Sequence, residues 1–117
     1  MAMKSMEDNE LVPVAMQIIL HAGDARVKAD EALEFAKNAD FNSAYASLAD
    51  SKADIIQAHQ SQTKVIQDET RGVTHEPNLL FTHAQDTLMT IASEIRFARR
   101  LVELYELILQ NGEENKQ

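Results

Sequence analysis

The chain has 117 residues, with 11 basic and 19 acidic side chains, a formal net charge of −8 and no cysteine. This is the length of one domain, so we expect residues 1–117 to form a single domain. The lack of thiols excludes a disulfide scaffold, a thiolate zinc site and a cysteine nucleophile on this chain. The negative charge disfavours nucleic acid and anionic membrane surfaces, which favours proteins or small molecules as partners.

The composition is typical of a helical protein, because glycine and proline are few. The opening residues, MAMKSMEDNE, are polar and acidic. They lack the basic start and apolar centre of a secretory signal. No apolar run approaches the ~20 residues that a membrane helix needs. We therefore expect an all-α protein that does not insert into a membrane.

A first helix is predicted over about residues 6–38. Its apolar positions alternate in steps of four and three, which is the pattern of a coiled-coil seam. The seam consists of Leu11, Ala15, Ile18, Ala22, Ala25, Ala29, Ala32 and Ala36. So many alanines predict that a neighbouring helix comes close, and the stripe indicates a core face rather than a partner-binding groove. Pro13 is compatible with the first helical turn, where its missing N–H is not needed.

A second helix is predicted over about residues 40–69, with Asp40 as its N-cap. Its seam consists of Phe41, Ala44, Leu48, Ser51, Ile55, Ala58, Gln62 and Val65. Ser51 and Gln62 are polar residues on this otherwise apolar seam. The segment 70–77 follows as a loop, because Gly72 and Pro77 interrupt the pattern. We expect His75 to be a solvated loop histidine.

A third helix is predicted over about residues 77–110, followed by NGEENKQ as a frayed tail. Its seam consists of Ala84, Leu88, Ile91, Ile95, Ala98, Val102, Tyr105 and Leu109. With short connections between helices of ~45 Å, the fold is predicted to be an antiparallel up-down-up three-helix bundle. The third helix is apolar on more than one face, which favours an oligomer. Leu80, Phe81, Met89, Phe97, Leu101, Leu104, Leu107 and Ile108 lie among these apolar positions.

One stretch of the third helix, LLFTHAQDTLMT at 79–90, carries polar residues between apolar ones. His83, Asp86, Thr87 and Thr90 share one helical face, because they are spaced by three, four and seven residues. The first interpretation is an ordinary surface hydrogen bond between His83 and Asp86.

Two further interpretations involve chemistry. A metal site would need more ligands, and His21 and His59 show no ligand spacing. Alternatively, His83 is a nucleophile, because a neutral imidazole near pH 7 can accept a phosphoryl group and later release it. The Thr87 and Thr90 hydroxyls and the Gln85 amide are then candidate donors to the phosphoryl oxygens.

Three segments of the chain resemble one known family. LLFTHAQDTLMT resembles the active-site segment of the lactose/cellobiose-family enzyme IIA component of the bacterial phosphoenolpyruvate-dependent sugar phosphotransferase system. IILHAGDARVKADEAL resembles that family's first helix. DFNSAYASLADSKADIIQAHQSQTKVIQDE resembles its second, with the pattern AH-x-x-QT at residues 58–63. The likeness covers about residues 11–105, in the family's order.

The resemblance implies a homotrimer of three-helix bundles. His83 matches the histidine that is phosphorylated by the phosphocarrier protein HPr. That histidine passes its phosphoryl group to a cysteine of the cognate component IIB, which works with the membrane component IIC. Asp86 matches an aspartate at the threefold axis, where three carboxylates hold one structural divalent ion, taken as Mg²⁺. A cation there removes the repulsion between the carboxylates.

The chain departs from the family at Thr87, where relatives often have a second histidine. Gln85 matches a glutamine of the family and is expected in the pocket, together with Thr87. For His21 and His59 we expect core or helix-surface roles. The disaccharide stays open, because lactose, cellobiose and chitobiose systems share these motifs.

Two other functions are compatible with a helical bundle of this kind. A non-catalytic adaptor bundle would bind a partner helix without any chemistry at His83. A two-component-type histidine phosphotransfer domain would pass phosphate to an aspartate, and is normally a monomeric four-helix bundle. A nucleotide-dependent enzyme is not indicated, because the chain has no G-x-x-x-x-G-K-[ST] loop.

Overall fold

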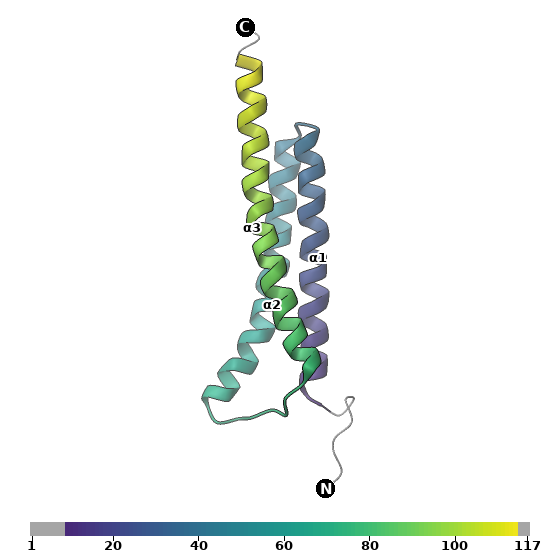
Figure 1. The fold of residues 1–117 in the computed structure, drawn as a ribbon, viewed down its shortest axis with the longest axis vertical. Coiled ribbons are helices and arrows are strands. Elements are labelled where there is room, and N and C mark those ends of the chain that lie inside the picture. Colours follow the sequence, from purple (N-terminus) through teal and green to yellow (C-terminus); the bar gives the residue numbers. More distant parts are fainter. Residues whose placement is uncertain (1–8, 115–117) are drawn as a thin grey trace.

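The computed structural model describes residues 9–114 and, within them, three helices and no strand (Figure 1). Helix α1 spans Leu11–Lys37, α2 spans Phe41–Thr70 and α3 spans Leu79–Glu114. The helices run up, down and up, so the predicted all-α three-helix arrangement is confirmed. None of the described helices has an apolar stretch long enough to cross a bilayer.

The start of α1 differs from the prediction. The Asn9 side chain accepts a hydrogen bond from the Leu11 amide at 2.9 Å, and the helix begins there rather than near residue 6. Residues 6–8 of the predicted helix lie outside the described residues. Pro13 lies in the first turn as predicted, where a missing N–H costs no hydrogen bond.

The connection between α1 and α2 is a tight turn. The Asp40 carboxylate accepts from the Ser43 amide at 3.2 Å, which confirms the predicted N-cap. The Asp40 amide donates back to the Phe35 carbonyl at 2.9 Å. Ala39, between the two helices, has a φ of 60°, in the left-handed region that favours glycine. The turn therefore reverses the chain at the expense of local backbone strain.

The second connection is a longer loop, residues 71–78, one residue later than predicted. Gly72 has a φ of 87° and its amide donates to the Glu69 carbonyl at 3.0 Å, which closes the end of α2. The Asn78 side chain accepts from the Phe81 amide at 3.0 Å. This capping interaction is the local reason that α3 begins at Leu79.

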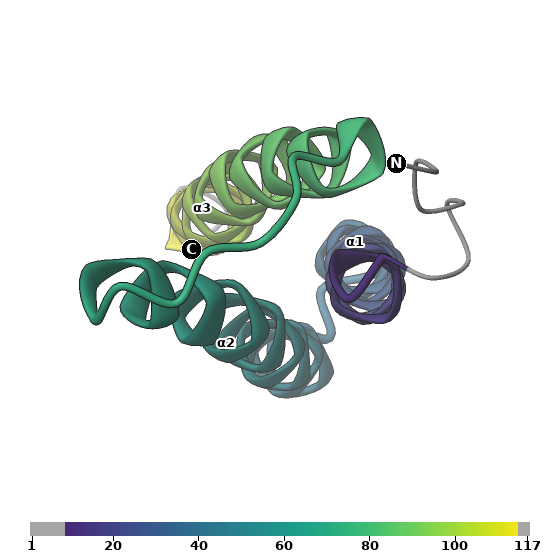
Figure 2. The same ribbon diagram turned by 90° about the horizontal axis from the view of Figure 1, so that it is seen from below.

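The prediction of a solvated His75 is wrong. The loop crosses the end of the bundle between the second and third helices (Figure 2). There the His75 side chain is only 11% exposed. Its Nδ1 lies 2.9 Å from Glu10 Oε2, and its Nε2 lies 3.6 Å from Asp68 Oδ2. His75 thus connects the loop to the start of α1 and the end of α2.

The core is built from the seams that the sequence predicts. Every predicted seam residue of α1 is buried, mostly alanine. The small side chains let the α2 backbone approach, and the buried Ser51 hydroxyl donates to the Ala25 carbonyl at 2.7 Å. This bond explains one polar residue on the α2 seam. The other, Gln62, has a buried Oε1 without a partner in the described part of the chain.

The end of α3 departs from the prediction. The helix continues through residues 111–114, which we expected to fray, while residues 115–117 lie outside the described residues. Figure 1 shows its yellow end extending past the connection between α1 and α2. Leu109 is therefore exposed rather than part of the buried seam. At the opposite end, α2 and α3 diverge from each other, as Figures 1 and 2 show.

Candidate functional site

His83 lies near the start of α3, on its second turn, with an exposed side chain. The neighbouring Phe81 and Ala84 are buried in the core, so the backbone that carries the imidazole is anchored. Just before α3, the Asn9 side-chain Nδ2 donates to the Glu76 carbonyl at 3.4 Å. Together with the His75 contacts, this bond ties the preceding loop to α1. An accessible imidazole on such a support is suited to reaction with a group brought by another molecule.

We expected Gln85 and Thr87 to lie with His83 in one pocket, and the structure arranges these side chains differently. The Thr87 hydroxyl donates to the His83 backbone carbonyl at 2.8 Å, so it is engaged within the helix. Gln85 is half-buried on another side of α3. Between residues 9 and 114 the structure shows no hydrogen bond between His83 and Asp86. The interpretation as a surface hydrogen-bonded pair therefore has no support.

Asp86 lies on the side of α3 that faces away from the core. It belongs to a strip of positions spaced by three, four and seven residues, which we name the outward stripe. The stripe consists of Leu79, Asp86, Thr90, Ser93, Phe97, Leu101, Leu104 and Ile108. Leu79 is 85% exposed and Phe97 is 68% exposed. A carboxylate thus lies in a largely apolar strip that no other helix of the described chain covers.

A metal site within one chain is not formed. Among the described residues no three histidine, aspartate or glutamate side chains converge as ligands. His59 instead lies on α2 in a shallow hollow that also contains Thr63 and Gln67, and His21 lies on α1. Asp86 alone offers the oxygen ligands that Mg²⁺ prefers. It is exposed and forms no ion pair in the described part of the chain.

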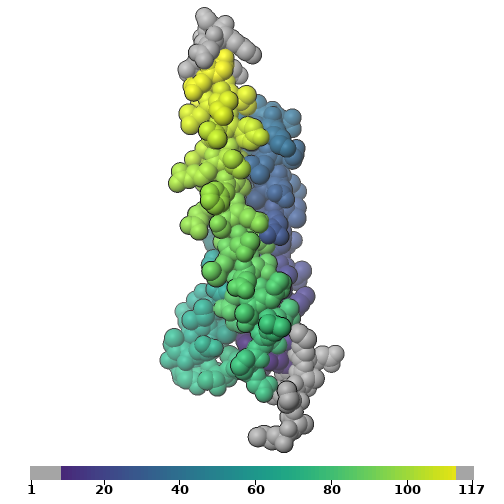
Figure 3. Space-filling view, viewed as in Figure 1, coloured from purple at the N-terminus to yellow at the C-terminus, as the bar shows by residue number. Residues whose placement is uncertain are grey.

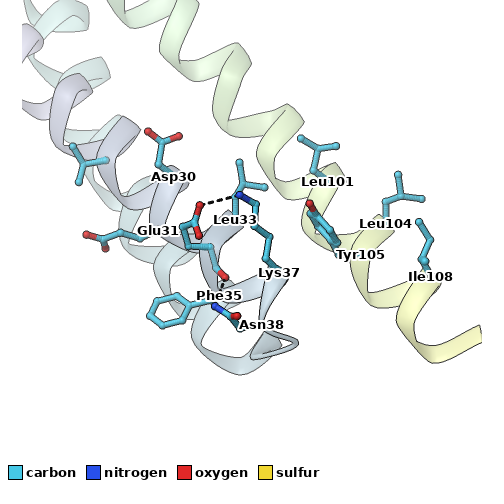
Figure 4. Close-up of a pocket in the computed structure, with 12 residues that line it drawn as sticks. Asp30, Glu31, Leu33, Phe35, Lys37, Asn38, Leu101, Leu104, Tyr105 and Ile108 are labelled. Carbon is cyan, nitrogen blue, oxygen red and sulfur yellow. Dashed lines mark hydrogen bonds and ion pairs between the residues drawn. The ribbon is translucent and has the colours of Figure 1, made fainter. Parts of the chain in front are cut away.

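The structure also shows two grooves that the sequence interpretation missed. One lies between α2 and α3 and is lined by Lys52, Arg96 and Arg99 above an apolar floor; we name it the basic groove. The other, of about 880 Å³, lies between the end of α1 and α3 (Figure 4); we name it the acidic groove. Asp30, Glu31 and Glu34 line it with Leu101, Leu104 and Ile108, and Lys37 also lines it, with its Nζ 3.0 Å from Glu34 Oε1. In the sequence, Asp30, Glu31 and Glu34 on one helix, and Arg96 and Arg99 on another, recur at steps of three or four residues.

The protein is thus a three-helix domain with an accessible histidine near the start of its last helix. Comparison with known proteins resolves the family. Residues 13–106 match the family model of the lactose/cellobiose-specific IIA subunit of the phosphotransferase (PTS) system. The chain belongs to this family.

Relatives and solved structures agree with this assignment. The lichenan-specific phosphotransferase enzyme IIA component of Bacillus subtilis is 39% identical over 88% of this chain and 94% of its own length. The cellobiose-specific enzyme IIA of Bacillus anthracis superposes with a TM-score of 0.80 at 34% identity, covering 92% of this chain and 95% of that chain. The IIA(chitobiose) of Escherichia coli, solved in complex with HPr, gives a TM-score of 0.74 at 35% identity, covering 85% and 96%.

Proposed function

We propose that this protein is a phosphoryl carrier of a bacterial sugar uptake system, with His83 as the residue that is phosphorylated. The observation that carries the proposal is the position of His83. Its imidazole is exposed and carried by a helix that is capped and anchored immediately before it. It also lies within the residues that match the IIA family.

The proposed phosphoryl transfer needs no nucleotide. A neutral ring nitrogen of His83 attacks phosphorus as the P–N bond of the donor phosphohistidine breaks. The electron pair of that bond stays with the donor's nitrogen. The donor ring takes up one proton, and His83 loses the proton on its other nitrogen. In the second step the acceptor thiol loses its proton, and the thiolate forms a P–S bond as the P–N bond on His83 breaks. The electron pair of the P–N bond stays with the His83 nitrogen, which takes up one proton, so His83 returns to a neutral imidazole.

We assign HPr as the donor, because a relative with the same fold was solved in complex with HPr. The acceptor is a cysteine of the cognate IIB, which works with membrane component IIC, and the carrier itself is cytoplasmic. The sugar is a β-linked one, because the relatives are named for lichenan, cellobiose and chitobiose. Among these the described residues favour none.

We further propose a homotrimer with the outward stripe of α3 at its threefold axis. Covering an exposed apolar strip with other copies lowers the free energy, because apolar surface is removed from water. Three copies of Asp86 would then meet and repel one another, and one Mg²⁺ coordinated by these carboxylates would offset that repulsion. We propose a structural role for the ion, because the phosphoryl transfer described above uses the His83 imidazole and needs no metal.

The test is phosphorylation from phosphoenolpyruvate with enzyme I and HPr, followed by intact mass and peptide mapping. We expect one acid-labile phosphoryl group per chain on His83, and none on His83→Ala with an unchanged fold. A folded protein that takes no phosphate from phosphorylated HPr would support the non-catalytic adaptor instead. Transfer to an aspartate of a receiver domain, by a monomer, would support the two-component-type phosphotransfer domain.

A further inference from the structure

The loop 71–78 leads directly into the part of α3 that carries His83. His83 lies four residues beyond Leu79, the first residue of α3, which is about 6 Å along the helix axis. The first turn of a helix frays readily, because its N–H groups have no partner within the helix. The position of the His83 imidazole therefore depends on how firmly the loop holds the start of α3.

One side chain of this loop reaches the rest of the bundle. Of residues 71–78, only His75 and Asn78 are not exposed, and the Asn78 side chain is used to cap α3. His75 is 11% exposed, and its ring contacts Glu10, the residue immediately before α1. The imidazole of His75 is therefore the side chain through which the loop is attached to α1.

Packing of apolar side chains contributes little to this attachment. A hollow of about 350 Å³ borders the loop and the start of α1, and it is lined by Asn9, Glu10, Thr74, His75, Glu76 and Pro77. None of these residues belongs to a core cluster of the described chain. The hydrogen bond from the Asn9 side chain to the Glu76 carbonyl is long, at 3.4 Å. The contact of 2.9 Å between His75 and Glu10 is thus the shorter of the two that hold the loop to α1.

The two ring nitrogens of His75 differ in what they contact. Nδ1 lies 2.9 Å from Glu10 Oε2 and carries a proton, because a carboxylate can only accept a hydrogen bond. Nε2 lies 3.6 Å from Asp68 Oδ2, beyond hydrogen-bond distance, and has no hydrogen-bond partner among the described residues. The Asp68 carboxylate is paired instead with Arg71, at 3.0 Å. Nδ1 is therefore the atom that holds the loop.

We infer that His75 is a positioning residue for the phosphorylation of His83. Its Nδ1–H bond to Glu10 fixes the loop against the start of α1, and the loop in turn fixes the first turns of α3. In-line phosphoryl transfer needs the attacking nitrogen in place, and a shift of about 1 Å can slow such a reaction about a hundredfold. His75 acts through the backbone and not by contact with the phosphoryl group. This inference rests on the proposed function of His83.

Two substitutions at His75 separate the roles of its ring nitrogens. His75→Asn keeps a donor close to the position of Nδ1, whereas His75→Gln keeps one close to the position of Nε2. With saturating phospho-HPr, we expect His75→Ala and His75→Gln to be phosphorylated at least about tenfold more slowly than the wild type. His75→Asn should stay within about threefold of the wild-type rate, because it keeps the bond to Glu10. A residue that only filled space would give the opposite order, because glutamine is closer to histidine in size.

Glu10 provides the second part of the test. Glu10→Ala removes the acceptor of the Nδ1–H bond and should slow phosphorylation as much as His75→Ala does. The double variant, with E10A and H75A, should be no slower than either single variant, because the same bond is lost in all three. Slowing that multiplies in the double variant would contradict the inference, because the two residues would then act independently.

Val102→Ala is the control for a loss of stability alone. Val102 is fully buried, in a core cluster separate from the one that contains Phe81 and Ala84. This substitution should lower the midpoint of urea unfolding and leave the rate of phosphorylation unchanged. Circular dichroism shows whether each variant is folded when its rate is measured.

Two results would overturn the inference and leave the carrier function intact. One is a wild-type rate for folded His75→Ala, and the other is an equal, slow rate for His75→Asn and His75→Ala. Failure of the wild-type protein to accept phosphate from phospho-HPr would instead refute the proposed function, and this inference with it.

Discussion

The hydroxyl of Thr87 donates to the carbonyl oxygen of His83, one helical turn earlier, at 2.8 Å. A hydroxyl that is held in this way has little freedom to serve a phosphoryl group. We expect Thr87→Val to leave the rate of His83 phosphorylation within about twofold, because valine keeps the shape and loses only an intrahelical bond. Single-turnover phosphorylation by phospho-HPr measures the rate. A hundredfold loss would show that the hydroxyl turns toward the phosphate.

Asp86→Leu is expected to remove metal binding and to keep or strengthen the trimer. The substitution replaces mutually repelling carboxylates with apolar side chains on the outward stripe. Sedimentation equilibrium with and without Mg²⁺ measures both effects. Asp50→Leu, an exposed aspartate on α2, serves as the control. Dissociation of a folded Asp86→Leu protein would count against an axial position for this residue.

His75→Ala is expected to destabilise the fold by about 1–2 kcal/mol, because it removes a mostly buried side chain and its contacts with two acidic residues. Urea unfolding of the purified protein gives the free energy. Thr74→Ala, at the adjacent exposed loop position, should change it by less than about 0.5 kcal/mol. Equal effects of the two substitutions would mean that the His75 contacts contribute nothing to stability.

We expect the ionisation of Tyr45 to lower the stability of the fold at alkaline pH. Burial, together with its hydrogen bond to Glu106, raises the pKa of the Tyr45 phenol above its usual value. The folded state therefore holds this proton more tightly than the unfolded state. Its contribution is complete below about pH 10 and is lost as pH rises through the folded-state pKa. Thermal unfolding between neutral pH and pH 11 should show a shallower alkaline decline for Tyr45→Phe; an identical decline would exclude this cause.

Ala39→Gly should stabilise the protein by about 0.5–1 kcal/mol. Ala39 has a φ of 60° and is exposed, so glycine relieves backbone strain without loss of packing. The added freedom of the unfolded chain subtracts part of the gain. Denaturant unfolding gives the difference, with Ala49→Gly in the exposed middle of α2 expected to destabilise by about 1 kcal/mol.

The sequence predicted the helices and their buried seams because both depend on local periodicity. Even Ser51, an apparent exception, proved to be buried through a bond to the backbone of α1. His75 was predicted wrongly because Glu10 is 65 residues away in the chain, so only the fold brings it to the imidazole, and Asp68 reaches it from the end of α2. Leu109 followed the helical period but had no neighbour to cover it.

The sequence singled out His83 and Asp86 as candidate site residues through their contrast with apolar surroundings and through family resemblance, and their roles stay predictions. It could not indicate that the Thr87 hydroxyl turns back to the helix, because either orientation suits the same spacing. The basic groove was missed for a different reason. Lys52 and Arg99 come from separate helices, so only the packing of α2 against α3 brings them together.

The last turns of α3, from Leu109 onward, extend past the other helices of their own chain. Isolated helical turns open and close readily, so their amide hydrogens should exchange with solvent within the dead time of an ordinary deuterium-labelling experiment. Assembly through the outward stripe would slow that exchange by several orders of magnitude. Deuterium uptake by the peptide that covers this end of α3 therefore reports association directly, without a label or a mutation.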